Sequence, residues 1–268
     1  MKLFFFRAVH YVLRHLNQID KYAEKKITEL SAKQFNEVLK EKAFDADNPF
    51  FNTINLITHA GGGMGGMAYL NCEEAFGQYR QKGNCVFEYD VDETPEHEYI
   101  LTHDGDGKSK IDFRFTPMKI EDCLKLLSAN KEIVVIFDCK FHKLDGFVDY
   151  IKRCCPDKSV LDRIVIQIFE EKNVKEVRDV YDFRMLYVCM TNTNYAEAAN
   201  LCLGNGIHAV SVPAKAFENR SDWSIFLNNR IHMFAYTVNT LTEYRELTSM
   251  GVTGVFSDFL TEEDIKRV

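Results

Sequence analysis

Ionisable side chains stand directly after several short apolar segments of this chain. Glu88 and Asp90 lie in CVFEYDVDET, and Asp138 and Lys140 follow the apolar run of VVIFDCKF. Alternate residues of a strand point to the same side, so each pair projects together. Converging carboxylates repel each other unless positive charge compensates, and hard cations such as Mg²⁺ and Ca²⁺ take oxygen ligands. The pattern predicts one divalent cation held by Glu88, Asp90 and Asp138.

Spacing alone leaves simpler interpretations of these residues open. Glu88 and Asp90 could form a solvated pair at a strand end that lysines compensate, since this spacing is common. Asp138 and Lys140 could form a buried ion pair. Buried ion pairs are poor stabilisers, and Asp138 follows five apolar residues, which favours a functional role. In that role Lys140 would face an anion.

Two histidines have positions suited to proton transfer. His59 ends the segment INLITH, and His103 ends YILTH and precedes Asp104. A single histidine at such a position is usually structural, but two that converge on carboxylates suit acid and base roles near neutral pH. The glycines that begin at Gly61, in GGGMGG, would let backbone N–H groups approach an anion. They lack the ending of a nucleotide-binding P-loop, and alone they indicate a flexible loop.

The elements that would position these groups alternate between strands and helices. Eight apolar, β-rich segments are Thr53–Thr58, Cys85–Tyr89, Ile133–Phe137, Arg163–Gln167, Met185–Cys189, Ile207–Val212, His232–Thr237 and Val252–Ser257. Helical patterns between them are Asn71–Lys82, Lys119–Asn130, Leu144–Cys154, Val174–Asp182, Tyr195–Gly204, Asp222–Asn229 and Leu241–Met250. This alternation predicts an α/β fold, a (β/α)₈ TIM barrel, whose chemistry sits at the carboxyl ends of the strands.

A doubly wound sheet is the alternative, but no G-x-G-x-x-G motif follows the first segment. One insertion, Thr94–Thr116, interrupts the alternation of strands and helices after the second strand. It contains two predicted short strands at Tyr99–Leu101 and Asp112–Phe115. Polar residues at the predicted strand ends also include Gln167 and Asn239. We expect them near the same site.

The N-terminal residues form a separate region in this interpretation. Residues 1–50 are expected to be a helical extension packed on the barrel of residues 51–268. Met1–His15 has apolar residues at helical spacing, interrupted by basic ones, and no cleavage site of a signal peptide follows. Its three consecutive phenylalanines would also suit peripheral contact with a membrane, but we favour a helix packed on the barrel.

Composition narrows the functional classes. The 268 residues are 46% hydrophobic and 27% charged, as in an ordinary globular protein. The formal net charge of −7 argues against nucleic acid as a partner. No segment approaches the roughly 20 apolar residues of a membrane-spanning helix. Eight scattered cysteines without a C-x-x-C pair indicate reduced thiols and a cytoplasmic protein.

The motifs taken together resemble the glycerophosphodiester phosphodiesterase family. The similarity begins with His59 and Gly61, then Asn71 with Ala75-Phe76, Glu88-Tyr89-Asp90-Val91 with Thr94, and His103-Asp104. It continues with IVVIFDCK, Ile166–Phe169, AYTVN (Ala235–Asn239) and GVTGVFSDF (Gly251–Phe259). Each motif is weak alone, but the ordered set spans about residues 53–260.

The resemblance implies a TIM barrel that hydrolyses a small phosphodiester with one divalent cation, Mg²⁺ or Ca²⁺. It assigns the cation to Glu88, Asp90 and Asp138, and acid and base catalysis to His59 and His103. Phosphate or substrate binding would fall to Lys140, Gly61, Gln167, Tyr236 and Asn239.

The chain departs from the family pattern at several positions. The family's Arg after the first His, which helps to hold the phosphate, is Ala60, so the resemblance places Ala60 beside the phosphate. The family's third acidic ligand is usually Glu rather than Asp138, and its Trp is Tyr236. Two alternatives therefore stand beside the hydrolase: a non-catalytic barrel that binds a phosphorylated ligand, motivated by Ala60, and a phospholipase D-like lipid enzyme. The substrate is expected to be a glycerophosphodiester or a related lipid-derived or polyol phosphodiester.

Overall fold

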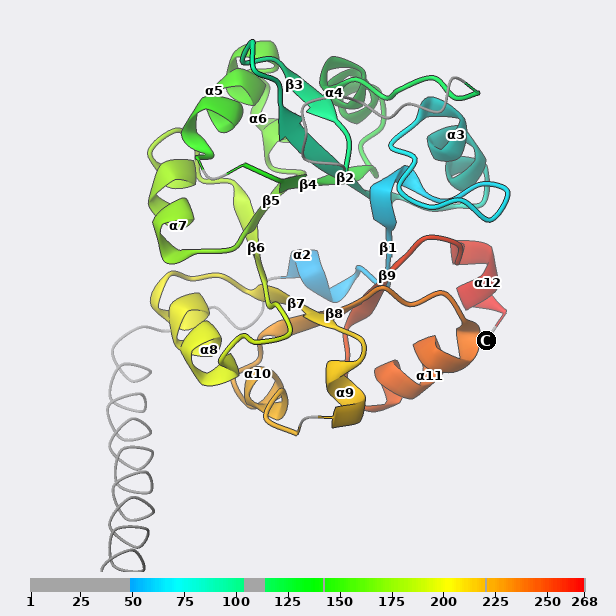
Figure 1. Ribbon diagram of the computed structural model, residues 1–268, viewed down its shortest axis with the longest axis vertical. Helices are drawn as coiled ribbons and strands as arrows, with labels where there is room; N and C mark the ends of the chain where they lie inside the picture. Colours follow the sequence, from blue (N-terminus) through cyan, green and yellow to red (C-terminus); the bar gives the residue numbers. More distant parts are fainter. Residues whose placement is uncertain (1–48, 104–113, 142, 220, 268) are drawn as a thin grey trace, which may run out of the picture. The chain divides into compact units, whose positions relative to one another are not determined.

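The computed structural model describes residues 49–103, 114–141, 143–219 and 221–267. Within them, eight parallel strands close into a barrel, seen in Figure 1 from the carboxyl ends of the strands. These strands are β1 (Leu56–Thr58), β2 (Val86–Glu93), β4 (Val134–Cys139), β5 (Ile164–Ile168), β6 (Arg184–Val188), β7 (Ala209–Pro213), β8 (His232–Tyr236) and β9 (Gly254–Ser257). Pairing of β1 with both β9 and β2 closes the ring, which confirms the predicted (β/α)₈ barrel.

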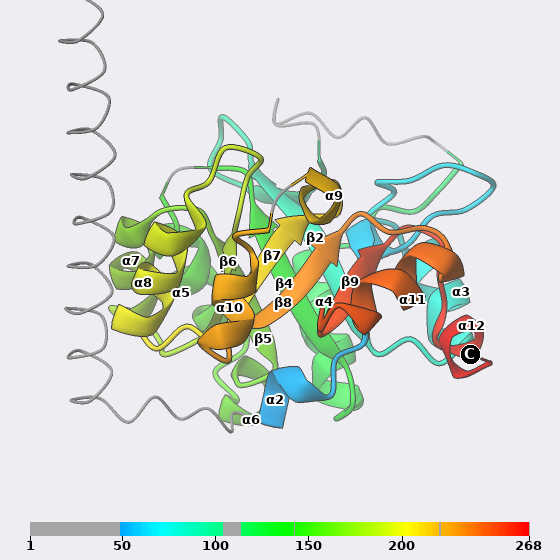
Figure 2. The ribbon, with the colours of Figure 1, turned by 90° about the horizontal axis from the view of Figure 1, so that it is seen from below.

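Helices follow most strands and cover the outside of the barrel (Figures 1 and 2). The helices are α2 (Pro49–Asn52), α3 (Glu73–Gln81), α4 (Ile120–Ala129), α5 (Asp145–Cys154), α6 (Lys158–Leu161), α7 (Glu171–Arg178), α8 (Tyr195–Gly204), α9 (Ala216–Asn219), α10 (Ser224–Asn228), α11 (Leu241–Ser249) and α12 (Glu262–Lys266). The seven predicted helices are all present, most with bounds shifted by one to three residues, as expected where caps decide the ends.

The second strand differs most from its prediction. It was expected to end at Tyr89, but β2 continues to Glu93 because its last residues pair with an antiparallel strand, β3 (Tyr99–Leu101). Glu88 and Asp90 are therefore buried within a strand and do not end it. The predicted strand at residues 112–115 does not form at Arg114 and Phe115, and its first two residues lie outside the described ones.

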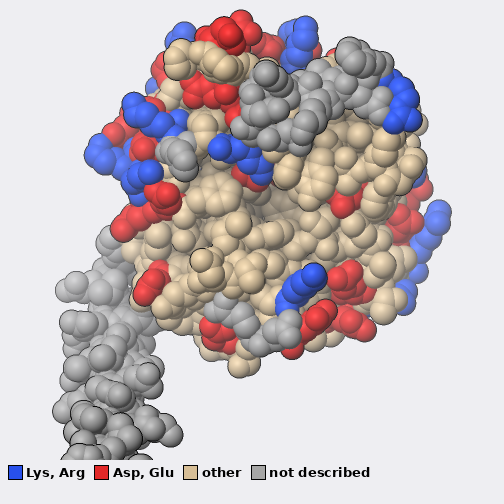
Figure 3. Space-filling view, viewed as in Figure 1, with Lys and Arg blue, Asp and Glu red and all other residues tan. Residues whose placement is uncertain are grey.

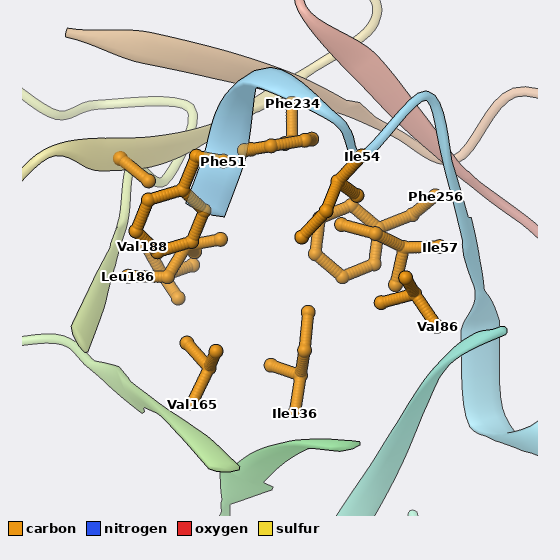
Figure 4. Close-up of a cluster of buried hydrophobic side chains, with 11 residues drawn as sticks. Phe51, Ile54, Ile57, Val86, Ile136, Val165, Leu186, Val188, Phe234 and Phe256 are labelled. Carbon is orange, nitrogen blue, oxygen red and sulfur yellow. The ribbon is translucent and has the colours of Figure 1, made fainter. Parts of the chain in front are cut away.

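Apolar side chains fill the lower part of the barrel interior. Figure 4 shows them pointing inward from the ring of strands and from the segment that precedes β1. The cluster consists of Phe51, Ile54, Ile57, Val86, Ile136, Val165, Leu186, Val188, Ala209, Phe234 and Phe256. Ile54 was expected in the first strand, but it precedes β1 and packs beneath it. The barrel is a packed core that fixes the direction of every strand above it.

The strand period of two then determines what lies above this core. In β2, Glu88 occupies the interior position two residues after the core residue Val86. In β4, Asp138 occupies the interior position two residues after Ile136. Ile57 in β1 is followed in the same way by His59, which begins the short 3-10 helix η1 (His59–Gly61). The interior changes from apolar to ionisable within one step along these strands.

All eight cysteines lie in the described ranges and are free thiols, of which five are buried. Cys154 is exposed, so not every thiol belongs to the core. No helix among the described residues is long and apolar enough to cross a membrane. The predicted N-terminal extension and the Met1–His15 helix lie outside the described residues, apart from Pro49 and Phe50 of α2.

Candidate active site

Three carboxylates meet at the carboxyl end of the barrel, as the sequence predicted. The register of β2 and β4 places Asp90 beside Asp138, and Glu88 stands one interior step below Asp90. One oxygen from each of Glu88, Asp90 and Asp138 lies within 4.8 Å of the others. Glu88 and Asp90 are almost completely buried, so this cluster is not a solvated pair at a strand end.

Neighbouring polar groups fix the three carboxylates. The Ala60 backbone N–H donates to Glu88 Oε2 at 2.8 Å. Asn71 makes two bonds with Asp90: its Nδ2 donates to Oδ2 at 3.1 Å, and its Oδ1 accepts from the Asp90 backbone N–H at 3.2 Å. With its amide nitrogen turned toward Asp138, Gln167 donates to both carboxylate oxygens at 3.2 Å. These contacts orient the oxygens before any ligand binds.

Lys140 provides part of the compensating charge. Its Nζ lies 2.5 Å from Asp138 Oδ2 and 2.8 Å from Asp90 Oδ1, so the ion pair that stood as the simpler alternative forms, and it includes Asp90. Burial opposes the charge of Lys140, but Asp138, Asp90 and Glu88 outweigh it and raise its pKa. Lys140 is therefore a firmly protonated ammonium group within the carboxylate cluster.

His59 is held by a residue that sequence reasoning did not assign. Its Nδ1 lies 2.7 Å from Asp258 Oδ1, in the segment after β9, and its Nε2 lies 3.9 Å from Glu88 Oε2. Asn239 orients Asp258 by donating to Oδ2 at 2.9 Å and accepting the Asp258 backbone N–H. Burial opposes the charge of His59, but the bond to Asp258 and the charges of Glu88 and Asp90 raise its pKa to about 9.

Negative charge exceeds positive charge in this group of residues. Burial, followed by repulsion from Asp90, raises the pKa of Glu88 to about 8, and burial likewise raises that of Asp138. With every group ionised, the three carboxylates and Asp258 face only Lys140 and His59. One divalent cation would balance the remaining two negative charges.

The residues fit such a cation in donor chemistry as well. Mg²⁺ and Ca²⁺ take carboxylate oxygens, and three are available here from two adjacent strands. Asp90 Oδ1 is buried and, apart from the ion pair with Lys140, has no hydrogen-bond donor in the described structure. Because a carboxylate oxygen has two lone pairs, Asp90 Oδ1 keeps one site for a cation beside the ammonium group of Lys140. Glu88, Asp90 and Asp138 would hold the ion.

Tyr69 lies between the two predicted acid/base residues. Its ring centroid is 4.9 Å from that of His59 and 4.3 Å from that of His103. His103 is exposed and makes no hydrogen bond to the described part of the chain. Tyr69 has a φ of 59°, a left-handed conformation that costs a non-glycine residue roughly 1–2 kcal/mol. The bond from the Asn71 N–H to the Ala60 carbonyl, at 2.8 Å, holds this segment in place.

A cavity of about 230 Å³ connects these groups. Figure 3, viewed as in Figure 1, shows a central hollow with mostly uncharged walls, whereas most charged residues lie toward the outer edge. The lining residues are His59, Tyr69, Glu88, His103, Asp138, Lys140, Gln167, Phe169, Val188, Met190, Ser211, Tyr236, Thr237 and Phe256. The predicted residues from the first, second, third, fourth and seventh strands thus reach one cavity.

Four positions that bear on the predicted site do not line the cavity. Asp90 lies beside it, within the carboxylate cluster. Asn239 acts on Asp258 as described. Gly61 has a φ of 74° and packs against Tyr89, whose ring would lie 2.9 Å from an added Cβ. Ala60, expected beside the phosphate, is fully buried; its N–H donates to Glu88 and its carbonyl accepts from the Asn71 N–H. Asp104 lies outside the described residues.

Asp258, Asn71 and Tyr69 contact the predicted histidines and carboxylates, yet the residue pattern did not assign them to the site. Asp258 directly follows β9, so the strand-end rule that selected His59 could have selected it. Asn71 appeared only as a matching motif residue. Nothing in the residue pattern distinguished Tyr69, because its position depends on the backbone of the loop after β1.

Comparison with solved structures finds the same architecture in several bacterial enzymes. An Oleispira antarctica phosphodiesterase in complex with the product sn-glycerol-3-phosphate superposes with a TM-score of 0.63 at 14% identity, over 79% of this chain and 96% of the other. A glycerophosphodiester phosphodiesterase from Parabacteroides distasonis has a TM-score of 0.61 at 19% identity, over 80% of this chain and 95% of the other. One from Agrobacterium tumefaciens has a TM-score of 0.60 at 13% identity, over 81% of this chain and 100% of the other.

No protein-family model matches the chain, and no curated protein matches its sequence. At these identities the similarity shows the fold. The chain shares the barrel architecture of these phosphodiesterases.

Proposed function

We propose that this protein is a phosphoric diester hydrolase of the glycerophosphodiester phosphodiesterase family that depends on one divalent cation. The observation that carries the proposal is the joint position of two histidines, Lys140 and a cluster of three carboxylates, of which Glu88 and Asp138 line the same cavity. The names of the structural neighbours, one of them bound to sn-glycerol-3-phosphate, support the same chemistry. The proposed substrate is a small phosphodiester built on glycerol.

Each residue has a distinct role in this proposal. A bound divalent cation would supply positive charge next to the phosphoryl oxygens. Lys140, already adjacent to Asp138, would face another phosphoryl oxygen as a point charge. His59 and His103 would exchange protons with the attacking hydroxyl and the leaving oxygen. The resemblance suggests attack by a neighbouring substrate hydroxyl, followed by opening of a cyclic phosphate by water.

Asp258 and Asn239 position His59 in this scheme. The 2.7 Å contact at Nδ1 leaves Nε2 directed toward Glu88 and the cavity. A histidine whose Nδ1 is held in this way presents Nε2 for proton transfer. Asp258 stabilises the imidazolium while it holds a proton. The free cysteines support a cytoplasmic setting for the reaction.

The test is hydrolysis of a glycerol-based phosphodiester followed by ³¹P NMR. The full-length protein would be incubated with substrate in Mg²⁺, in Ca²⁺ and in chelator, with Asp138→Asn as the matched variant. We expect a phosphomonoester to appear with cation, and its release to fall steeply in chelator and in Asp138→Asn. Cation-independent turnover would contradict the proposed cation role. Tight phosphodiester binding without turnover under any condition would instead support the non-catalytic barrel.

A further inference from the structure

The two sides of the cavity differ in chemistry. Residues from β1, β2 and β4 supply the histidine, carboxylates and ammonium group described above. Residues on and after β5, β6, β8 and β9 supply a largely apolar side, which we call the apolar wall. It consists of Phe169, Val188, Met190, Tyr236 and Phe256. The division follows from which strands carry ionisable residues one step above the core.

The apolar wall is an extension of the barrel core. Val188 and Phe256 belong to the buried cluster, and Phe169 and Tyr236 pack against it. The Tyr236 hydroxyl donates to the Cys189 carbonyl at 2.7 Å, so the residue contributes its ring to the wall. Because this surface is anchored in the core, it is formed before a ligand arrives, as is usual in binding pockets.

Few polar groups interrupt this side of the cavity. Ser211 and Thr237 line it, and Ser211 is only 1% exposed. Gln167, at the boundary between the two sides, directs its amide toward Asp138. A polyol lying against the apolar wall would leave most of its hydroxyls without partners, which is costly in a desolvated site.

The wall also reaches the outer surface. Met190 is 51% exposed, and Tyr69, on the opposite side of the cavity, is 47% exposed. They are two of the five exposed large hydrophobic residues among those described, and both line this cavity. Exposed apolar side chains at the mouth of a cavity are typical of ligand contacts.

We propose that the cavity selects phosphodiesters in which one of the two alcohols carries an apolar group, and that this group lies against Phe169, Val188 and Met190. The inference rests on the proposed function and narrows its substrate class. The charged side would receive the phosphate, and the apolar wall would receive the alkyl or aryl portion of the alcohol that is not glycerol. The charge division of the cavity fixes this orientation.

Two esters of sn-glycerol 3-phosphate, one with ethanol and one with hexanol, test the inference. Both are short enough to stay monomeric at low concentration, so no lipid surface takes part. Complete burial of one methylene group contributes about 0.8 kcal/mol, which corresponds to about fourfold in kcat/KM. A methylene group that contacts the apolar wall on one side only is buried by about half and gains about half that energy. For four added methylenes we expect the hexyl ester to be preferred about tenfold to a hundredfold. Equal kcat/KM values would overturn the inference.

Variants assign the preference to the wall. Met190→Gln keeps the length of the side chain and adds a polar amide, and Val188→Thr keeps its shape and adds a hydroxyl. Each should reduce the hexyl-to-ethyl ratio by at least about threefold. Met250→Gln is the matched control, because Met250 is 44% exposed and lies outside the cavity lining. Its ratio should equal that of the unaltered protein.

The outcomes distinguish a failure of the proposed function from a failure of the proposed substrate preference. If neither ester is hydrolysed with cation present, the proposed function fails, and the inference fails with it. If both are hydrolysed equally, only the inference fails. A hexyl preference that survives in both wall variants, each with an unchanged melting temperature, would also overturn it, because the selectivity would then come from elsewhere.

Discussion

Cation binding to the metal-free protein should release protons and tighten as the pH rises. Burial and the neighbouring Asp90 raise the pKa of Glu88 to about 8, whereas a cation needs the ionised carboxylate. At pH 6 about 1% of Glu88 is ionised, and at pH 8 about half is. The apparent association constant for Mg²⁺ should therefore rise about fiftyfold over this range.

Isothermal titration calorimetry measures both quantities. Titrations at pH 7 in two buffers of different ionisation enthalpy should show release of at least about 0.9 proton per ion, the protonated fraction of Glu88 at that pH, and Asp138, whose pKa is also raised, can only add to it. Glu88→Gln is the matched variant, because it keeps the shape and removes the titrating group. It should bind Mg²⁺ more weakly and with a shallower pH dependence. An association constant in the unaltered protein that stays within twofold from pH 6 to 8 would refute this reasoning.

Three further predictions follow from single contacts. Asp258→Asn should lower the pKa of His59 by at least about one unit, because the charged partner at 2.7 Å is removed. NMR titration of the His59 ring protons in the metal-free protein measures this pKa, and an unchanged value would contradict the role of Asp258 as the partner of His59. Ala60→Arg should destabilise the fold by about 1–3 kcal/mol in denaturant titrations, because Ala60 is fully buried with a φ of 47°. Unchanged stability together with tighter phosphate binding would instead place residue 60 beside the phosphate. The metal-free protein should lose stability between about pH 6.5 and 9 in thermal melts, because the folded-state pKa of His59, about 9, exceeds its ordinary value of 6.5. The contribution of His59 to the free energy of unfolding, about 3 kcal/mol, is complete below pH 6.5 and disappears as the pH passes 9. A stability that rises over this range would contradict the charge assigned to His59.

The barrel was predictable because each of its strands has a local signal. Segments such as IVVIF and IVIQI are continuously apolar, as strands buried on both faces must be, and helical patterns separate them. The position of the site followed from the same rule, since Glu88, Asp138 and His59 stand one interior step above core residues. Period two and the closure of the sheet are enough to bring them together.

Contacts made by loops were not predictable in this way. Tyr69 reaches both histidines because its backbone is left-handed, and no residue type demands that conformation. Ala60 looked like a missing phosphate contact, yet its buried N–H binds Glu88. The extension of β2 to Glu93 depends on pairing with β3, a tertiary contact that periodicity in β2 alone does not reveal.

Turnover of the two histidine variants tests the central claim most directly. His59→Asn retains a polar group near Asp258, and His103→Gln alters an exposed side chain, so both variants should fold. With a glycerol-based phosphodiester and saturating cation, each should lose about 10²–10⁴ in kcat, while Mg²⁺ binding by calorimetry persists because neither histidine is a proposed ligand. Near-normal turnover by His59→Asn would contradict the acid/base assignment and the site built around it.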